Sequence, residues 1–456
     1  MRTFIFSISL FLLSTLSLNA QPVKHVILIS IDGFHPDMYE DSTWPTPNLR
    51  ELMKKGTYAD HMLSVFPAYT YPSHTAMLTG ALPARSGIFF NQPKGSKGEW
   101  NWFTSAIKTP TLWQVFKKAG LTTAAVEWPA SVSPEITWDL PEIWDVNHPD
   151  DRITATRQYA SPGLVEEIEQ HATGKLDSTN LNDNYFSLDE NAGRAAAYIF
   201  MAHKPSFLAV HFATVDGNEH DQGRDGDSVR LAVACNDRAI GDILEAVQKS
   251  GLTDSTTILI VGDHGFSTIH TVFRVNMLIK HVPAIFIASG GSAFLYRYRG
   301  TTQQDVPGIV QAVRAALDSL PGDKRNLFRI IDRAELDKMG ADSSALLALA
   351  AVPGTVFSGA TQTRPTENHG PGTLIQQGPL EGVFVSTHGG HHGYDPREPL
   401  MYTGFIAEGA AINKGGHIGE LCVTDIAPLV ARLLGVPFTC PDGKLVSGII
   451  QNSPGQ

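Results

Sequence analysis

Cysteine and positive charge are scarce in this sequence, and each shortage excludes a class of protein. The three cysteines, Cys235, Cys422 and Cys440, are too few for a disulfide scaffold in a chain of 456 residues. Cys422 and Cys440 could form one bond in an oxidising compartment, and three ordinary thiols fit the sequence as well. Lysine and arginine total 35 against 46 acidic residues, a net charge of −11, so the chain lacks the basic surface that grips a nucleic-acid duplex. A nucleotide would therefore have to bind at a local site.

The apolar stretch at the N-terminus is short for a helix that crosses a membrane. Residues 1–20 contain one cation, no acid, an apolar run from Phe4 to Leu18, and the small residue Ala20 at the end. This pattern favours a secretory signal peptide, cleaved after Ala20, over a membrane anchor. The mature protein, 21–456, is then expected to be secreted or periplasmic and to have no membrane anchor.

Composition and periodicity indicate a large α/β protein. Apolar residues make up 42% of the chain and no low-complexity tract is present, which excludes disordered and fibrous classes. The length allows two or three domains, or one large α/β domain with insertions. Short apolar runs alternate with helix-period segments, which predicts a mostly parallel central sheet flanked by helices. The expected strands are Val26–Ile31, Thr122–Trp128, Phe207–Val215, Thr256–Gly262 and Thr403–Gly409. The expected helices are Asn48–Lys55, Pro110–Lys118, Asn191–His203, Val229–Lys249 and Val423–Leu434.

This alternation breaks between about residues 276 and 383. The segment contains a possible strand-helix passage and a stretch rich in glycine, proline and threonine near 358–378. Strand-like and helical segments resume after it, so we expect an inserted cap over the sheet rather than an independent domain. The cap should border the ligand cleft as a lid or specificity region.

Three of the expected strands run into an aspartate: Asp32, Asp216 and Asp263. In open α/β sheets the ligand crevice lies at the carboxyl ends of the strands, so these side chains should converge. Three carboxylates in a partly buried cleft would repel one another, and a cation is needed among them.

Histidines accompany these acids along the chain. His220 follows the second acid, His264 follows the third, and the pair His391-His392 opens the segment HHGYDP. Mixed Asp/His sets favour zinc or a similar transition ion. One aspartate at a strand end is more often a cap or turn residue. Because acids and histidines recur together in separate βα units, a metal site is the better explanation, and His388 is expected to be an ordinary histidine.

A hydroxyl residue occupies a position suited to phosphate chemistry. Thr70 precedes Tyr71-Pro72, and the residues that follow suit a helix beginning near the proline. The N-terminus of a helix attracts phosphate, although a simple capping role for the hydroxyl is an alternative. Threonine is a poor nucleophile unless a base or a metal activates it, and the predicted metal site would do so.

Together these blocks resemble the nucleotide pyrophosphatase/phosphodiesterase family of the alkaline phosphatase superfamily. The segments ISIDGF, TYPSHTAMLTG, VEWPAS, VDGNEH, GDHGF and HHGYDP occur in the order and approximate spacing of that family, over essentially the whole mature chain. The resemblance implies an alkaline phosphatase-like fold and two zinc ions per chain. It assigns Asp32, Asp263 and His264 to one ion, and Asp216, His220 and His392 to the other. It also implies that Thr70 is the nucleophile and forms a phospho-threonine, and that Asn91 donates to a nonbridging phosphate oxygen.

The sequence departs from the family pattern beside the nucleophile. Many diesterases of this family have Asn where this chain has Ser73, and Phe where it has Tyr71. Tyr71 could stack on the base of a substrate, or it could simply pack beside Pro72. The block also shares a skeleton with sulfatases, but Thr70 and His74 stand where a sulfatase needs a Cys or Ser and an Arg.

We therefore expect a hydrolase of small phosphorylated substrates, nucleotides or other phosphodiesters. One alternative is an alkaline phosphatase with a threonine nucleophile, which acts on monoesters. Monoesterases of this superfamily usually place Lys or Arg against the phosphoryl group, and the only cation near Thr70 in the sequence is Arg85. Arg297 or Arg299 of the insertion could supply another. A second alternative is a binding protein that has lost catalysis, but the complete set of ligands and the hydroxyl argue against it.

Overall fold

The structure, a computed structural model, describes residues 23–182, 184–362 and 380–451. The signal peptide expected at 1–20 lies outside these residues, as does the part of the cap between 363 and 379. Among the described helices, none combines the length and the apolar character that crossing a bilayer requires.

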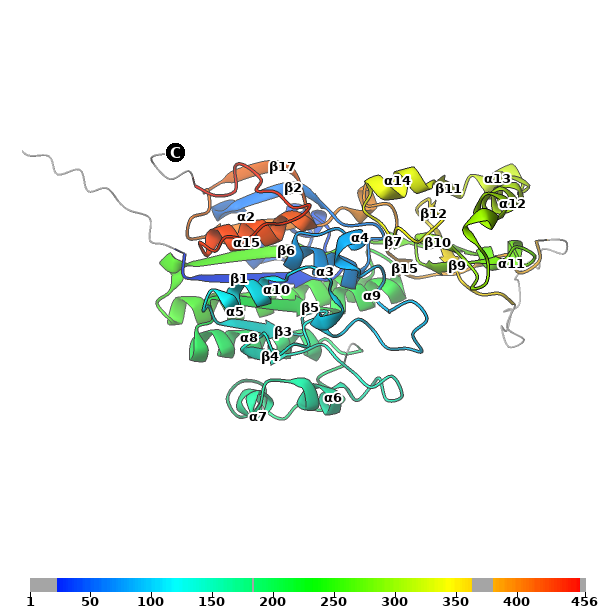
Figure 1. Cartoon of the computed structure of the whole chain (residues 1–456). Helices are drawn as coiled ribbons and strands as arrows, with labels where there is room; N and C mark the ends of the chain where they lie inside the picture. The colour runs from blue at the N-terminus through cyan, green and yellow to red at the C-terminus, as the bar shows by residue number, and fades with distance from the viewer. Residues whose placement is uncertain (1–22, 183, 363–379, 452–456) are drawn as a thin grey trace, which may run out of the picture.

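An eight-stranded sheet forms the centre of the molecule (Figure 1), in the order β17-β2-β16-β6-β1-β5-β3-β4. The central strand β1 pairs in parallel with both β5 and β6, whereas β16 runs antiparallel to β6 and β2. This mostly parallel sheet confirms the expected fold class. The strands are β1 (His25–Ile31), β2 (Thr57–Leu63), β3 (Thr123–Val126), β4 (Trp138–Leu140), β5 (Phe207–Phe212), β6 (Thr256–Gly262), β16 (Phe405–Gly409) and β17 (Gly416–Cys422).

The side chains of β1 alternate between two hydrophobic layers, as the pleat of a strand requires. Ile27, Ile29 and Ile31 face one layer, and Val26 and Leu28 face the other. Helices α2 (Pro47–Lys55), α8 (Ser187–His203) and α10 (Asp227–Lys249) pack in the first layer. Helices α3 (Thr70–Thr79), α5 (Leu112–Lys118) and α15 (Ile426–Leu433) pack in the second. Helices therefore cover both faces of the sheet. A ligand site is expected at the carboxyl ends of the strands.

The five expected strands correspond to β1, β3, β5, β6 and β16, and the five expected helices to α2, α5, α8, α10 and α15. The three-residue strand β4 was not expected, and neither were strands β2 and β17. The latter two lie at one side of the sheet and are partly exposed, and β17, with the sequence GHIGELC, contains glycine and charge where a buried strand would be apolar. The remaining short helices of this part are α1 (Asp37–Glu40), α4 (Pro83–Ser86), α6 (Arg152–Tyr159), α7 (Leu164–Ile168) and α9 (Thr214–Gln222).

The chain between β6 and β16 builds a second part of the molecule with sheets of its own. This part lies beside the large sheet, to its right in Figure 1. A four-stranded antiparallel sheet, β11-β12-β10-β9, packs with α12 around a hydrophobic cluster of its own. We call the segment from β8 to β14 the cap. Its elements are β8 (Thr271–Arg274), α11 (Val275–Leu278), β9 (Ala284–Ser289), β10 (Ser292–Arg297), α12 (Val306–Asp318), α13 (Gly322–Arg325), β11 (Phe328–Ile331), α14 (Arg333–Lys338), β12 (Leu347–Ala351), β13 (Thr355–Ser358) and β14 (Phe384–Ser386), and the short pair β7 (Ser267–Thr268) and β15 (Gly390–His391) flanks it.

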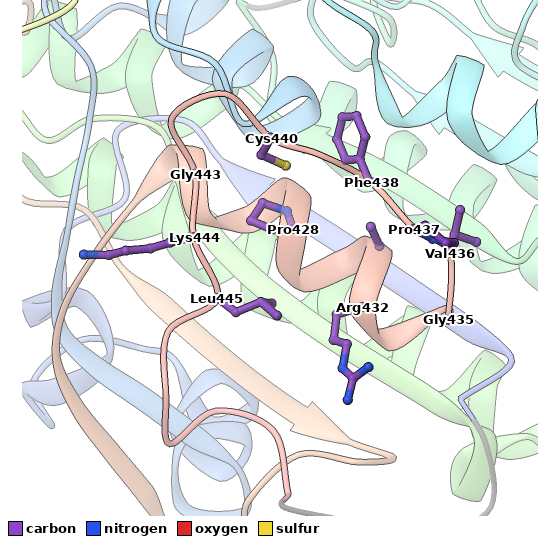
Figure 2. Close-up of a pocket in the computed structure, with 11 residues that line it drawn as sticks. Pro428, Arg432, Gly435, Val436, Pro437, Phe438, Cys440, Gly443, Lys444 and Leu445 are labelled. Carbon is purple, nitrogen blue, oxygen red and sulfur yellow. The ribbon is translucent and has the colours of Figure 1, made fainter. Parts of the chain in front are cut away.

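A hollow lies between α15 and the chain that follows it, and Figure 2 shows the side chains around it. Its walls include Pro428, Val436, Phe438 and Leu445, and among the described residues no carboxylate or imidazole lines it. It therefore offers no ligand set of the predicted kind. Cys440 also borders it, and all three cysteines are free thiols in this structure.

Candidate active site

The first predicted ligand set assembles where β1 and β6 end. These neighbours pair in parallel up to Ile31 and Gly262, so the residues that follow emerge side by side. His264 Nε2 lies 3.2 Å from Asp32 Oδ1 and 3.1 Å from Asp263 Oδ2. All three side chains are buried. The pairing of the two strands is sufficient to bring these ligands together.

The second predicted set comes from a helix and a loop. Asp216 and His220 lie one turn apart on α9, with 3.5 Å between Asp216 Oδ2 and His220 Nε2. His392, directly after β15, places its Nε2 3.7 Å from Asp216 Oδ1. The structure thus gathers all six predicted ligands at one edge of the sheet.

The prediction that a strand runs from Phe207 to Val215 is wrong at its end, because β5 stops at Phe212. The buried carboxylate of Asp189, on α8, accepts the backbone N–H groups of Ala213 and Thr214, each at 2.9 Å. These bonds cap the N-terminus of α9. Asp216 therefore lies in the first turn of a helix, which is what aligns it with the imidazole one turn later.

Hydrogen bonds orient the imidazoles of the second set. His220 Nδ1 lies 3.1 Å from the carbonyl of Gly390, and His392 Nδ1 lies 2.9 Å from the carbonyl of Ala68. A carbonyl only accepts, so each Nδ1 carries the proton and each Nε2 presents its lone pair to the carboxylate side. Metal-binding histidines are commonly fixed in this way.

The buried carboxylates suit a bound cation. Asp32 Oδ1 and Asp263 Oδ2 are buried and receive no hydrogen bond from the described residues, although buried polar atoms normally find a partner. Burial raises the pKa of both groups well above its ordinary value, and the charges of neighbouring acids raise it further. Burial also lowers the pKa of His264 and His392, so these rings are neutral. Neutral rings cannot balance the carboxylates, whereas divalent ions would.

Among the described residues, three compact groups of ligand atoms could hold such ions, with all atoms of a group within 4.8 Å of one another. The first predicted set forms one group intact. The second predicted set is divided between the other two groups, one of which also includes His264 and the other His391. The three groups are Asp32–Asp263–His264, Asp216–His264–His392 and His220–His391–His392. His388, by contrast, is exposed and belongs to none of these groups.

The hydroxyl of Thr70 lies beside the first group. Helix α3 begins at Thr70, close to the proline as expected, and Thr70 Oγ1 is 3.4 Å from His264 Nε2. Buried His74, one turn along α3, places Nδ1 2.8 Å from the carbonyl of Thr70 and Nε2 2.9 Å from Ser30 Oγ on β1. The first turn of α3 is therefore held against the end of β1.

Asn91 is also held beside the start of α3. Its Oδ1 accepts the backbone N–H of Tyr71 at 3.0 Å, which leaves both donors of its Nδ2 for other partners. The ring of Tyr71 itself is completely buried, with its edge against Trp100, and its hydroxyl donates to Glu142 Oε2 at 2.9 Å. Of the two roles considered for Tyr71, the structure therefore shows packing inside the protein. It leaves no face of the ring open for stacking on a substrate in the described structure.

Sequence reasoning missed one buried histidine that supports the cluster. His211 lies near the end of β5, paired with Ser30 of β1, and its Nε2 is 3.1 Å from Asp32 Oδ2. Its Nδ1 lies 3.0 Å from the carbonyl of Glu127. The isolated histidine in the apolar run FLAVHF was the available signal, since an imidazole buried in a central strand needs polar partners.

The fold and this strand-end cluster define an alkaline phosphatase-like α/β protein with a candidate nucleophile next to a candidate metal centre. The family model described as type I phosphodiesterase / nucleotide pyrophosphatase matches residues 26–395, which is most of the chain. The chain therefore belongs to the type I phosphodiesterase / nucleotide pyrophosphatase family.

Individual relatives are distant in sequence but cover most of the chain. An uncharacterised pyrophosphatase/phosphodiesterase of Schizosaccharomyces pombe is 24% identical over 423 residues, 90% of this chain and 77% of that protein. The mouse bis(5'-adenosyl)-triphosphatase enpp4 is 22% identical over 426 residues, with the same coverage of 90% and 77%.

Among solved structures, murine ectonucleotide pyrophosphatase/phosphodiesterase 5, as an inactive variant in complex with AMP, matches with a TM-score of 0.65 and 17% identity. This match covers 92% of this chain and 97% of that one. The human form of the same protein matches with a TM-score of 0.64 and 18% identity. At these identities the structural likeness supports the fold.

Proposed function

We propose that this protein is a secreted nucleotide pyrophosphatase/phosphodiesterase that uses two zinc ions and Thr70 as the nucleophile. The observation that carries the proposal is the position of Thr70 Oγ1, 3.4 Å from His264 Nε2 and beside two carboxylates that each have one buried oxygen, Asp32 Oδ1 and Asp263 Oδ2, without a hydrogen bond from the described residues. The names of the relatives favour nucleotide substrates, since one is a bis(5'-adenosyl)-triphosphatase and one solved structure holds AMP. Other relatives are named ectonucleotide enzymes, which agrees with secretion.

The donor atoms suit zinc because they combine carboxylate oxygens with imidazole nitrogens. Asp32, Asp263 and His264 would hold one ion, and Asp216, His220 and His392 the other. When bound, two zinc ions would lower the pKa of a nearby hydroxyl, and they would change the charge of the three aspartates from about −3 to about +1, which attracts an anionic phosphoryl group.

In this proposal the Thr70 oxygen attacks phosphorus while the ester oxygen departs with its electron pair. The hydroxyl proton of Thr70 is lost, and the departing oxygen takes up a proton. A phospho-threonine results, and water then cleaves it to restore the hydroxyl and release phosphate or a phosphate monoester. The Nδ2 group of Asn91 donates to a nonbridging oxygen, where negative charge develops in the transition state.

The cations of the protein favour a diester over a monoester. In the part of the chain that the structure describes, neither Asp32 nor Asp263 forms an ion pair with a lysine or an arginine. The Nε of Arg85 donates to Asp442 Oδ1 at 3.0 Å, and Arg297 donates to the carbonyl of Thr301. These two arginines are thus engaged elsewhere in the described structure, and neither is placed to meet the extra charge of a monoester.

The test compares kcat/KM for a nitrophenyl phosphate monoester with that for the matching nitrophenyl nucleotide diester, using protein whose zinc content has been measured. We expect the diester to be preferred and the zinc content to be near two per chain. A monoester preference above about tenfold, or 1.4 kcal/mol in transition-state binding, would favour the alkaline phosphatase alternative. Protein that binds no zinc and hydrolyses neither ester would favour the binding-protein alternative.

A further inference from the structure

The turn of the cap hairpin β9–β10 contacts the loop that carries a predicted ligand. Gly290 and Gly291 form this turn, between Ser289 at the end of β9 and Ser292 at the start of β10. The backbone N–H of Gly291 donates to the carbonyl of His392 at 2.9 Å. A Cβ at Gly290 would overlap that carbonyl, so the close approach requires glycine there.

Tyr69 reaches the same turn from the nucleophile segment. It directly precedes Thr70, in an extended conformation with φ −121° and ψ 155°. Its hydroxyl donates to the carbonyl of Ser289 and lies 3.0 Å from Ser292 Oγ, which can donate to it. The residue is only 4% exposed, and a Cβ at Gly393 would overlap its ring. The side chain is therefore held at both its ring and its hydroxyl.

These contacts form a closed cycle of hydrogen bonds next to the start of α3. Ala68, the neighbour of Tyr69, accepts the Nδ1–H of His392 at 2.9 Å. The carbonyl of His392 in turn accepts Gly291 N–H of the cap turn, and the turn binds the Tyr69 hydroxyl. Helix α3 has no side-chain hydrogen bond at its N-cap. The Tyr69 hydroxyl thus links the cap to the backbone immediately before Thr70.

We propose that Tyr69 is a positioning residue through which the cap turn holds Thr70 in place for attack. The inference rests on the proposed function, in which Thr70 is the nucleophile. A small displacement of a reacting atom slows the chemical step far more than it weakens substrate binding. Loss of the Tyr69 hydroxyl should therefore lower kcat and leave KM nearly unchanged.

The test is Tyr69→Phe in the full-length, zinc-loaded protein, which removes the hydroxyl and keeps the ring. We expect kcat to fall by about tenfold, KM to stay within about twofold and the zinc content to remain that of wild type. Tyr296→Phe is the matched control, because Tyr296 is a tyrosine of the cap whose hydroxyl likewise donates a hydrogen bond, to Asp342 Oδ2 at 2.8 Å. It should lower the melting temperature by a similar amount and leave kcat unchanged.

Ser292→Ala provides a second variant that keeps Tyr69 and removes one partner of its hydroxyl. It should lower kcat in the same direction by a smaller factor, and the double variant should lose less than the product of the two single factors. Wild-type kcat in both Tyr69→Phe and Ser292→Ala, an equal kcat loss in Tyr296→Phe, or a loss of zinc from Tyr69→Phe would each overturn the inference.

The comparison uses whichever phosphate ester the wild type hydrolyses, so a failure of the diester preference does not affect it. A wild type that hydrolyses no ester would overturn the proposed function, and this inference with it. Normal wild-type turnover with unaffected variants would overturn this inference alone.

Discussion

His264 and His392 stack face to face, with ring centroids 3.8 Å apart and ring planes 6° from parallel. His264 belongs to the group with Asp32 and Asp263, while His392 turns its Nε2 toward Asp216. Burial lowers the pKa of both imidazoles, so two neutral rings are in contact and no charge repulsion separates them. The two predicted ligand sets thus meet at these stacked rings, and both rings also form a compact group with Asp216.

This arrangement predicts the effect of His392→Ala on metal content. The variant should lose roughly one equivalent of zinc and most of its activity, because removing one metal ligand weakens one site strongly. Elemental analysis after dialysis against buffered zinc would measure the loss. His388→Ala is the control, since His388 is exposed and outside the ligand groups, and it should keep wild-type zinc and turnover.

His391→Ala provides a check on the assignment within the same segment. We expect it to be less damaging than His392→Ala, even though His391 shares a group with His220. A larger zinc loss from His391→Ala than from His392→Ala would show that the assignment in HHGYDP is off by one residue.

Replacing Thr70 by alanine should reduce kcat by at least about 10³-fold, because the attacking oxygen is lost. The zinc content should be unchanged, since the predicted ligands Asp32, Asp263 and His264 all remain to hold the adjacent ion. Thr70→Ser, which keeps a hydroxyl, should retain measurable turnover and a trappable phospho-enzyme. A folded, zinc-loaded Thr70→Ala protein with wild-type turnover would exclude the nucleophile assignment.

Asn91→Ala should lower kcat by about 10²-fold, the usual effect of removing one donor to developing negative charge. The neighbouring exposed residue Gln92 supplies the control, and Gln92→Ala should behave as wild type. Steady-state kinetics on the diester would measure both. An Asn91→Ala effect confined to KM would mean that Asn91 binds the ground state and the transition state equally.

Chelation should lower the melting temperature more at pH 8 than at pH 5.5. In the metal-free protein, burial and neighbouring acids raise the pKa of Asp32 and Asp263 above the ordinary value of 3.8. The pKa of such a carboxyl group is higher in the folded protein than in the unfolded one. The free energy of unfolding therefore falls as the pH rises from the unfolded pKa towards the folded one. Bound metal would remove this cost, and protons compete with metal less at pH 8.

Thermal unfolding with and without a chelator, at both pH values, would measure the difference, and added zinc should reverse it. An equal or larger decrease at pH 5.5 would contradict the assignment of these carboxylates to a metal site.

The sequence by itself determined five of the eight strands of the central sheet and most of the candidate ligands at their ends. Runs such as Thr256–Gly262 are long, apolar and rich in β-branched residues, and their strand character needs no distant partner. Residues that directly follow such strands, including Asp32 and Asp263, have their place fixed by the chain itself. The family motifs added the nucleophile and the metal assignment, which single residues did not establish.

Only the tertiary structure decided where distant parts of the chain meet. Asp216 lies on a helix because Asp189, far away in the sequence, caps that helix. Tyr71 is buried because Glu142 and Trp100 pack around it, and Tyr69 meets the cap because a glycine turn allows backbones to approach. Periodicity and turn residues act within a few positions, whereas capping and packing depend on partners that the fold brings together.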